Sequence, residues 1–293
     1  IYYGQEARLR KGSYEIPSDV MLLDADRKSH FWCFGTTRVG KTRVMENMVE
    51  QDIRKGYNLA VIDPKGDLDL LNKIVQVADD CGRLHQLLLI TPIFPEFSET
   101  IDPLSHHYMV EELVGHIVSG VETQEKFFFN VAQEVSLAIV QGLLMTKEKR
   151  ENANERRFNL NDVKNLMSRE ELVGLQGEIS RCMSMEGAEQ LYRDIQKILD
   201  SPQDYYSKVS SSLRVALMEL SSGNIGRIVG TARGNRFIDR LERGEGVILV
   251  AHLGALLTRR AAYTLGRVLV SMIQSFAGRV FSAGRVLDPP LCV

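Results

Sequence analysis

The sequence has few cysteines, and none of them is paired in a recognisable motif. The four are scattered along the chain, at Cys33, Cys81, Cys182 and Cys292. No Cys-x-x-Cys pair or metal-ligand spacing occurs, so neither a disulfide framework nor a cysteine-ligated metal site is expected. We expect reduced thiols in a cytosolic setting. The neighbours His106 and His107 are interpreted as part of a solvated loop rather than a metal site.

Long hydrophobic runs are also missing. The longest uncharged apolar stretch, residues 246–258, is shorter than the roughly 18 residues that a bilayer span needs. No signal peptide is visible, and neither an internal repeat nor a low-complexity tract stands out. The chain begins at Ile1 rather than at Met and ends at Val293 within an expected strand. We therefore interpret it as a fragment. This interpretation leaves open an N-terminal membrane anchor outside the chain.

A strong overall charge is absent, but the charge is unevenly distributed. The 293 residues are 44% hydrophobic and 25% charged, with a formal net charge of −2, as expected for a soluble globular protein of about two domains. Residues 227–285 contain ten arginines, no lysine and three acidic residues, a local net charge of +7. The C-terminal third is therefore basic and the remainder acidic.

Short apolar runs alternate with helical patterns in the first hundred residues. The runs predict strands over 30–34, 57–62 and 86–91, and the periodicity predicts helices over 41–55 and 68–78. This alternation is typical of a parallel α/β sheet.

The middle of the chain has helical periodicity and almost no strand signal. Helices are expected over 123–147, 186–199 and 204–220, and a capping box at Ser168 predicts another helix start. The polar segment 147–161 reads as an exposed connection. The α/β pattern then returns, with a helix over 236–243, a strand over 246–252, a helix over 259–281 and an unfinished strand over 287–293. We therefore expect a nucleotide-binding domain in two parts, 1–105 and 227–293, with an all-helical domain, 106–226, inserted between them.

One motif carries a chemical mechanism. Residues 35–42, GTTRVGKT, match the P-loop pattern G-x-x-x-x-G-K-[ST], with an expected strand before it and an expected helix after it. Its backbone N–H groups and the positive end of the helix favour phosphate oxygens. Lys41 would reach the β and γ phosphates, and the Thr42 hydroxyl would hold Mg²⁺; these two are the candidate catalytic residues. The candidate ATP-binding residues are Gly35, Thr36, Thr37, Arg38, Val39, Gly40, Lys41, Thr42, Arg43 and Asp63.

ATP hydrolysis needs a further acid to hold Mg²⁺ and a group to orient water. The strand over 246–252 ends in Ala251-His252, so it supplies no acid pair. The acid pair could instead follow the unfinished strand, beyond Val293. Asp63 is the one acid that ends a strand of the expected sheet. It either approaches the nucleotide or shapes the turn of residues 63–67 and caps the next helix.

Three further features have weaker interpretations. The arginines of 227–243 either face nucleic-acid phosphates or form a solvated face or subunit contact. In the run Phe127 to Phe129, two rings are expected in the helical core and one exposed, with base stacking as the less favoured role. Trp32, which precedes the P-loop, is expected in the core.

The chain resembles a known family in three places. These are FWCFGTTRVGKT at 31–42, NLAVIDPKGD at 58–67, and a helical insertion entered through IDPLSHHY and left through RGEGVILVAHLGAL. Together they look like a type IV secretion coupling protein of the conjugative TraG/TraD-like group, which are RecA-like DNA-pumping ATPases. Chromosome-segregating translocases of the FtsK/HerA kind share the Asp-Pro-Lys turn.

The resemblance implies a motor with ATP and Mg²⁺ as cofactors. It implies a homo-hexamer on the cytoplasmic side of the bacterial inner membrane, anchored through N-terminal helices that this chain does not contain. Such a motor feeds relaxase-bound single-stranded DNA to the proteins of a type IV secretion channel during conjugation. The phosphate site would be Gly35, Gly40, Lys41 and Thr42, with Asp63 and Lys65 on the adjacent turn. The family's Walker B acid pair, polar sensor and arginine finger have no match in this chain.

Two other hypotheses remain. The chain could be a nucleotide-gated recruitment module that binds ATP without turnover and engages protein cargo through the helical domain. It could also be a P-loop kinase or transferase with the inserted helices as a lid, although no second substrate site is visible.

Overall fold

Aliphatic runs form the parallel strands of a four-stranded sheet. The strands are β5 Asn58–Asp63, β6 Leu87–Ile90, β7 Ile248–His252 and β8 Leu291–Cys292, in the order β6-β7-β5-β8. Every residue of the inner strand β7 is buried, as expected for a parallel strand that helices cover on both faces. The computed structural model describes residues 2–6, 9–10, 13–14, 18–28, 30–123, 125–147 and 158–293.

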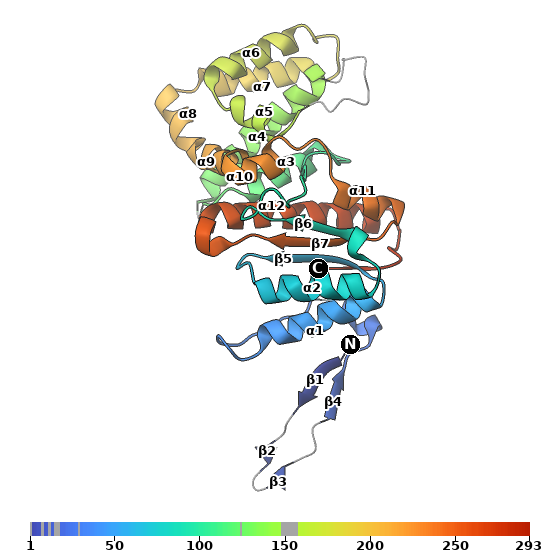
Figure 1. Cartoon of the computed structure of the whole chain (residues 1–293). Helices are drawn as coiled ribbons and strands as arrows, with labels where there is room; N and C mark the ends of the chain where they lie inside the picture. The colour runs from blue at the N-terminus through green and yellow to red at the C-terminus, as the bar shows by residue number, and fades with distance from the viewer. Residues whose placement is uncertain are drawn as a thin grey trace.

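The register brings the carboxyl ends of the strands to one edge. Leu59 and Leu87 both lie beside Ile248, and Asp63 lies beside His252. The turns that follow β5, β6 and β7 therefore meet at the same edge, on the left of Figure 1. Ligands of parallel α/β sheets bind at this edge.

Two amphipathic helices cover one face of the sheet. They are α1 Lys41–Arg54 and α2 Leu68–Asp80, which lie below the strands in Figure 1. Ile53 and Ile74 pack there against Ile248 and Val250 of β7. Helix α2 begins where Asp67 accepts a hydrogen bond from the N–H of Asp69, and the 3₁₀ turn Leu84–Gln86 leads on to β6.

The other face is covered by the long helix α12, Ala255–Ser282. Its buried residues Leu265 and Leu269 belong to the same core cluster as Ala60 and Leu88 of the sheet. That cluster continues without a break into the helices above, including Ile117. The sheet and the helical block therefore share one hydrophobic core.

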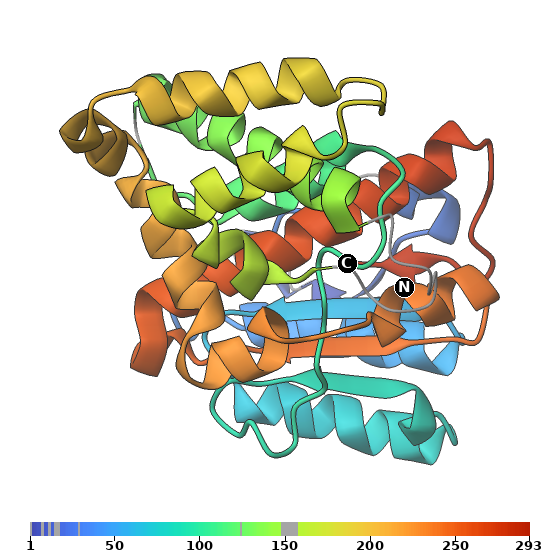
Figure 2. The ribbon, with the colours of Figure 1, turned by 90° about the horizontal axis from the view of Figure 1, so that it is seen from above.

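The block of helices lies between β6 and β7 in the chain. Its helices are α3 Val110–Ser119, α4 Lys126–Lys147, α5 Leu160–Asn165, α6 Arg169–Ser180, α7 Ala188–Asp200, α8 Gln203–Val209, α9 Ser211–Ser221, α10 Gly223–Ile225 and the π-helical turn Gly226–Gly230, after which α11 Arg236–Arg243 leads into β7. Figure 2 shows the block displaced to one side, so that the strands remain visible beside it. The expected domain limits, 1–105, 106–226 and 227–293, remain predictions.

Helix α4 is long and apolar enough to cross a membrane, by length and composition alone, over Lys126–Thr146. Its residues Val135, Ile139 and Leu143 are buried in the shared core. It contacts α3, α6 and α7. Helix α4 therefore serves here as the central core helix of the block.

A thin antiparallel ribbon projects below the sheet (Figure 1). It pairs β1 Tyr2–Glu6 with β4 Ser18–Met21, and β2 Leu9–Arg10 with β3 Ser13–Tyr14. The 3₁₀ helix Asp24–Lys28 joins it to the body, where Arg27 donates to both carboxylate oxygens of Asp52 at 2.6 and 2.8 Å.

The expected strand before the P-loop is wrong. Residues 30–36 belong to no strand, and the side chain of Trp32 is 74% exposed rather than in the core. A strand forms only where a neighbouring strand takes up its backbone hydrogen bonds, and among the described residues β8 is the partner on that side of β5. Trp32 stacks instead on Phe34, with ring centroids 6.1 Å apart.

Other expected elements occur with shifted ends. The helix expected over 204–220 is two helices, α8 and α9, which meet at Ser210, whose Oγ bonds the Tyr206 carbonyl at 2.7 Å. The helix expected over 259–281 begins four residues earlier, at Ala255, and the strand expected over 287–293 is limited to Leu291–Cys292. Ser168 accepts from the N–H of Glu171 at 3.3 Å and caps α6 as expected. Residues 148–157 of the expected polar connection lie outside the described residues.

Candidate phosphate-binding site

Glycines allow the tight path of the loop 35–40. A Cβ on Gly35 would lie 2.6 Å from Cγ2 of Val39, so a side chain there would collide with the loop itself. Gly40 has a φ of 95°, in the left-handed region where glycine is favoured. Arg38 also adopts the left-handed region, at φ 65°, although its side chain makes this conformation less favourable than it is for glycine. Gly40 is thus favoured by the backbone conformation of this loop, and Gly35 by the close approach of the Val39 side chain.

The N-terminus of α1 is open. Gly40 is its N-cap and supplies no side-chain acceptor, and the first turn contains no acidic residue. The first N–H groups of the helix therefore point outward with the positive end of the helix dipole, which favours an anion.

Lys41 lies folded over this loop. Its Nζ donates to the carbonyl oxygens of Gly35 at 2.7 Å and of Thr36 at 2.5 Å. The ammonium group is thereby held next to the open helix terminus, where a bound phosphate would meet it.

Thr42 and Arg43 complete the first turn of α1 and are both exposed. Arg43 donates to Glu46 at 2.7 Å, and this bond raises the pKa of its guanidinium, with Asp69 and Asp67 adding smaller contributions. Arg43 therefore already has a carboxylate partner on its own helix.

The carboxylate of Asp63 shapes the turn that follows β5. One oxygen accepts from the N–H of Lys65 at 3.0 Å, and the other accepts from the N–H of Asp67. Asp67, not Asp63, caps α2. Of the two roles considered for Asp63, its hydrogen bonds correspond to turn formation, and its approach to a nucleotide remains a prediction.

The turns after β5 and β7 are locked together. Leu253 donates to the carbonyl of Asp63 at 3.0 Å, and Ala255 donates to that of Pro64 at 2.6 Å. A Cβ on Gly66 would come within 3.2 Å of both Gly254 and the ring of His252. The turn of residues 63–67 is therefore held by close backbone packing at the same sheet edge.

Sequence reasoning missed a buried polar pair at this edge. His252 is 2% exposed and Thr91, at the end of β6, is 1% exposed. Both ring nitrogens of His252 and the Thr91 hydroxyl have no hydrogen-bond partner among the described residues. The sequence does contain a signal for this pair, because Thr91 directly follows an apolar run and His252 ends another.

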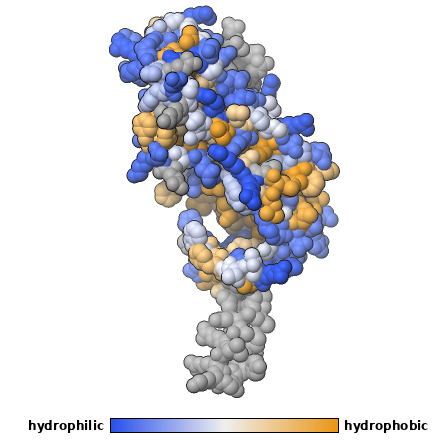
Figure 3. Space-filling model, turned by 90° about the vertical axis from the view of Figure 1, so that its left-hand side faces the viewer, coloured by the Kyte–Doolittle hydropathy of each residue, from blue (hydrophilic) through white to orange (hydrophobic). Residues whose placement is uncertain are grey.

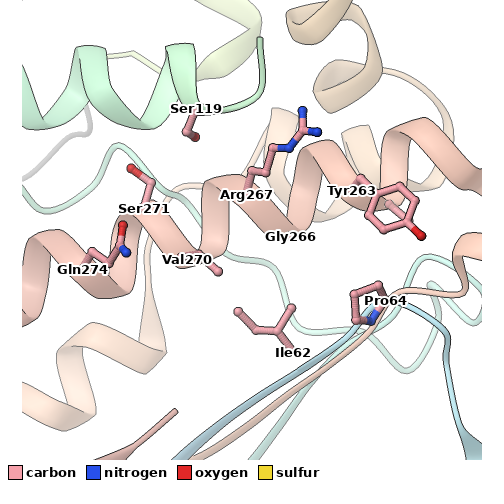
Figure 4. Close-up of a pocket in the computed structure, with 10 residues that line it drawn as sticks. Ile62, Pro64, Ser119, Tyr263, Gly266, Arg267, Val270, Ser271 and Gln274 are labelled. Carbon is pink, nitrogen blue, oxygen red and sulfur yellow. The ribbon is translucent and has the colours of Figure 1, made fainter. Parts of the chain in front are cut away.

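A groove of about 460 Å³ opens beside the Asp63 turn. In Figure 4, Ile62 and Pro64 form its floor, and Tyr263 and Arg267 of α12 lie across from them. Ile62 packs against the core cluster on the α12 face, whereas Val61 packs on the α1 and α2 face. The groove is therefore on the other face of the sheet from α1.

Several large apolar side chains are exposed before and within the P-loop. Figure 3 shows this edge of the molecule, with hydrophobic side chains gathered beside a hollow. Phe34 is 86% exposed, and Phe31, Trp32 and Val39 are also exposed. The segment before the loop and the loop itself thus present large apolar side chains to solvent.

The basic C-terminal third does not form one free positive patch. Arg236 pairs with Glu99, Arg260 with Glu219 at 2.8 Å, and Arg267 with Glu122 at 3.4 Å. Arg240 donates to the carbonyl of His85 at 3.0 Å. Most of these guanidinium groups are therefore paired with neighbouring residues.

The structure can be compared with the expectations for the phenylalanine run and for the neighbouring histidines. Phe127 is 50% exposed, with Phe128 and Tyr205 at its ring edge, whereas Phe129 packs against the core. His106 and His107 lie in the expected loop, before α3, with His107 exposed and His106 half-buried. Asp239 lies 3.0 Å from Nε2 of His106, and Ser105 lies 2.8 Å from its Nδ1. Within the described part of the chain, no three His, Cys, Asp or Glu residues could together hold a metal ion.

Comparisons with known proteins find similarity in structure alone. No family profile and no curated protein matches the sequence. The fold is similar to that of the bacterial conjugative coupling protein TrwBΔN70 in an unbound form, with a TM-score of 0.50 and 14% identity over 82% of this chain and 49% of that one.

Two nucleotide complexes of the plasmid coupling protein TrwB are similar over 82% of this chain and 50% of theirs. The complex with ADP and Mg²⁺ has a TM-score of 0.49 and 13% identity, and that with the ATP analogue ADPNP has 0.48 and 14%. The chain therefore spans about half the length of these proteins. The likeness to the unbound coupling protein concerns the fold, and it confirms the expected class: an α/β, RecA-like arrangement with a parallel sheet and helices inserted between its strands.

Proposed function

We propose that the chain is the nucleotide-binding part of an ATP-driven coupling protein that moves DNA toward a type IV secretion channel in conjugation. The observation that carries the proposal is the loop 35–42, in which Lys41 is held beside an uncapped helix terminus. The fold likeness to a conjugative coupling protein supports the same assignment.

The bound nucleotide would be ATP with Mg²⁺. The backbone of residues 35–40 and the first turn of α1 would hold the phosphates, Lys41 would neutralise the β and γ phosphates, and Thr42 would contribute its hydroxyl to Mg²⁺. The loop geometry fits such a group, because the open N–H groups and the ammonium converge on one place.

The hydrogen bonds of Asp63 bear on whether this chain alone hydrolyses ATP. Both carboxylate oxygens of Asp63 accept backbone hydrogen bonds, so Asp63 is committed to its turn. This observation favours the second candidate function for the chain itself, a module that binds ATP and changes conformation without turnover. ATPase activity then belongs to the longer protein in the proposal.

The proposed partners follow from the coupling-protein role. They are single-stranded DNA with its relaxase, the secretion-channel proteins, and further copies of the chain in a hexamer at the inner membrane. Helix α11 ends just before β7, so its arginines lie at the sheet edge opposite the P-loop. In a ring of head-to-tail copies, that edge would face the P-loop of the next copy.

The first experiment measures nucleotide binding by the chain. Fluorescent ATP with Mg²⁺ is titrated against the wild type, Lys41→Ala, and the control Lys197→Ala, whose side chain is 69% exposed on α7. We expect Lys41→Ala to weaken binding by about tenfold or more, because it removes a charge-assisted contact to phosphate, and Lys197→Ala to leave it unchanged.

The outcomes separate the candidates. Absence of binding by the wild type, or equal affinity in Lys41→Ala, contradicts the nucleotide-binding role. Binding without turnover in the chain, together with DNA-stimulated turnover in a longer protein, supports the motor. Equal turnover of the longer protein with and without single-stranded DNA counts against DNA pumping.

A further inference from the structure

A second cavity lies at the sheet edge opposite the P-loop. It measures about 810 Å³, within the usual range for small-molecule sites. Its walls are the segment 107–109 and Glu112 of α3, the end of α12 from Ser275 to Ala283, and Glu242 of α11. Phe276, Val280 and Met109 make much of this lining apolar.

The carboxylate of Glu112 in this cavity is already satisfied. One oxygen accepts from the N–H groups of Tyr108 and Met109, at 3.0 and 3.1 Å, and the other accepts from the hydroxyl of Ser275. Burial alone would raise the pKa of Glu112, but these bonds and the charge of Arg279 together lower it, so the carboxylate is ionised at neutral pH.

Arg279 pairs with Glu112, but its Nε makes no hydrogen bond among the described residues. This Nε is buried and lies 3.7 Å from Glu112, beyond hydrogen-bond distance. Its guanidinium lies 5.9 Å from the ring centroid of Phe276. A buried N–H of a permanently charged group is costly unless an acceptor reaches it, and a guanidinium fork fits carboxylate or phosphate.

A second cation borders the same cavity. Arg285 follows α12, is exposed, and lines the cavity with Arg279. The cavity therefore combines an apolar wall with two arginines. The carboxylates of Glu112 and Glu242 border it as well, and that of Glu112 is already held by its own hydrogen bonds. The cavity shares no lining residue with the loop 35–42.

We propose that this cavity binds a small amphipathic anion, a carboxylate or phosphate carried on an apolar body. The oxyanion would accept from Arg279 and Arg285, and the apolar body would lie against Phe276, Val280 and Met109. This site goes beyond the proposed function, since it requires neither ATP nor DNA.

The test uses two oxyanion probes and a neutral one. Binding of 4-phenylbutyrate, phenyl phosphate and 4-phenylbutanamide to the whole chain is measured by ligand-observed NMR titration. We expect the neutral amide to bind about tenfold more weakly than at least one oxyanion, because it cannot take the charge-assisted bonds. Binding of one oxyanion alone identifies the natural ligand class as carboxylate or phosphate.

Two variants and two controls locate the binding. Arg279→Met removes the charge and keeps the apolar stem, while Gly278→Leu fills the cavity from a position where an added Cβ meets nothing within 4 Å. Each should weaken oxyanion binding about tenfold. Arg267→Met, on the same helix but in the groove of Figure 4, should leave binding within about twofold. Lys41→Ala should do the same for 4-phenylbutyrate, which carries no phosphate group for the P-loop.

Three results would overturn the proposal. They are equal binding of the neutral amide, unchanged binding in both cavity variants, and loss of 4-phenylbutyrate binding in Lys41→Ala, which would place this probe at the P-loop. The Lys41 arm also separates this proposal from nucleotide binding, because either can fail while the other stands.

Discussion

Asn58 joins three strands at the start of the sheet. Its Nδ2 donates to the carbonyl of Pro289 at 2.8 Å, before β8, and its Oδ1 accepts from the N–H of Val247 at 2.9 Å, before β7. The side chain is 3% exposed and uses both ends of its amide. A single buried amide thus holds the residues that precede β7 and β8 against the start of β5.

His116 is a buried imidazole near the second cavity. It is 2% exposed, its Nδ1 lies 2.9 Å from the Ser271 hydroxyl, and burial lowers its pKa from 6.5 to about 4, with Arg279 and His107 also lowering it and Glu112 opposing them. The neutral form is therefore the one that the folded chain accommodates.

This burial predicts a pH-dependent stability. The unfolded chain binds a proton at His116 near pH 6.5, whereas the folded chain does so only near pH 4. Stability from this group is therefore full above pH 6.5 and falls as the pH drops toward 4, by about 3 kcal/mol in total. Urea unfolding of the wild type and of His116→Asn at several pH values measures it. An equally steep loss in His116→Asn over this range would assign the effect to other groups.

Helix α1 connects the P-loop to the base of the ribbon. It begins after Gly40 and ends near Asp52, which pairs with Arg27. Past its end, Arg83 donates to the carbonyls of Ile53 at 2.7 Å and Tyr57 at 2.9 Å, and so satisfies the backbone at the helix C-terminus. The helix is held firmly at this end, and its open end lies at the loop 35–40.

Two arginines near the start of α11 have different surroundings. Arg233 is exposed and makes no ion pair in the described part of the chain, whereas Arg236 pairs with Glu99. An arginine free to contact a phosphate contributes more to the salt dependence of DNA binding than one that must first leave a carboxylate.

Salt titrations with single-stranded DNA test this difference. If this segment contacts DNA, Arg233→Ala should reduce the slope of log affinity against log salt by about one, and Arg236→Ala by less. The measurement is fluorescence anisotropy of a labelled oligonucleotide at several salt concentrations. An unchanged slope in both variants would assign these arginines to a subunit contact or to the solvated surface.

The shared core is a property of the whole molecule. Ala60 and Leu88 of the sheet, Leu265 of α12 and Ile117 of α3 belong to one continuous cluster. Elements that share a core lose their packing together when either part unfolds.

We therefore expect the sheet and the helical block to unfold in one transition. Ile117→Ala, which empties a fully buried position of α3, should lower the unfolding free energy by about 2–5 kcal/mol and move that single transition. Calorimetry provides the test, through agreement of the calorimetric and van't Hoff enthalpies. Two transitions, of which Ile117→Ala moves only one, would instead support independently folding domains at the expected limits.

The fold class and the P-loop follow from local sequence patterns. The alternation of apolar runs and helical periodicity predicts β5, β6, β7, α1 and α2, because side-chain spacing reflects the period of each element. The motif of residues 35–42 predicts an uncapped helix terminus, since glycine at 40 adopts a positive φ and offers no side-chain cap. These features depend on neighbouring residues alone.

Contacts between distant segments decided the rest. Residues 30–36 have the composition of a strand, yet they form none, because a strand depends on a partner that its own sequence does not specify. The burial of His252 between the turns of the sheet edge and the approach of Arg279 on α12 to Glu112 on α3 likewise arise between elements brought together by folding. The sequence by itself determined the elements and the phosphate loop, and the tertiary structure decided which polar groups are satisfied, because hydrogen-bond partners far apart in the chain meet only in the folded state.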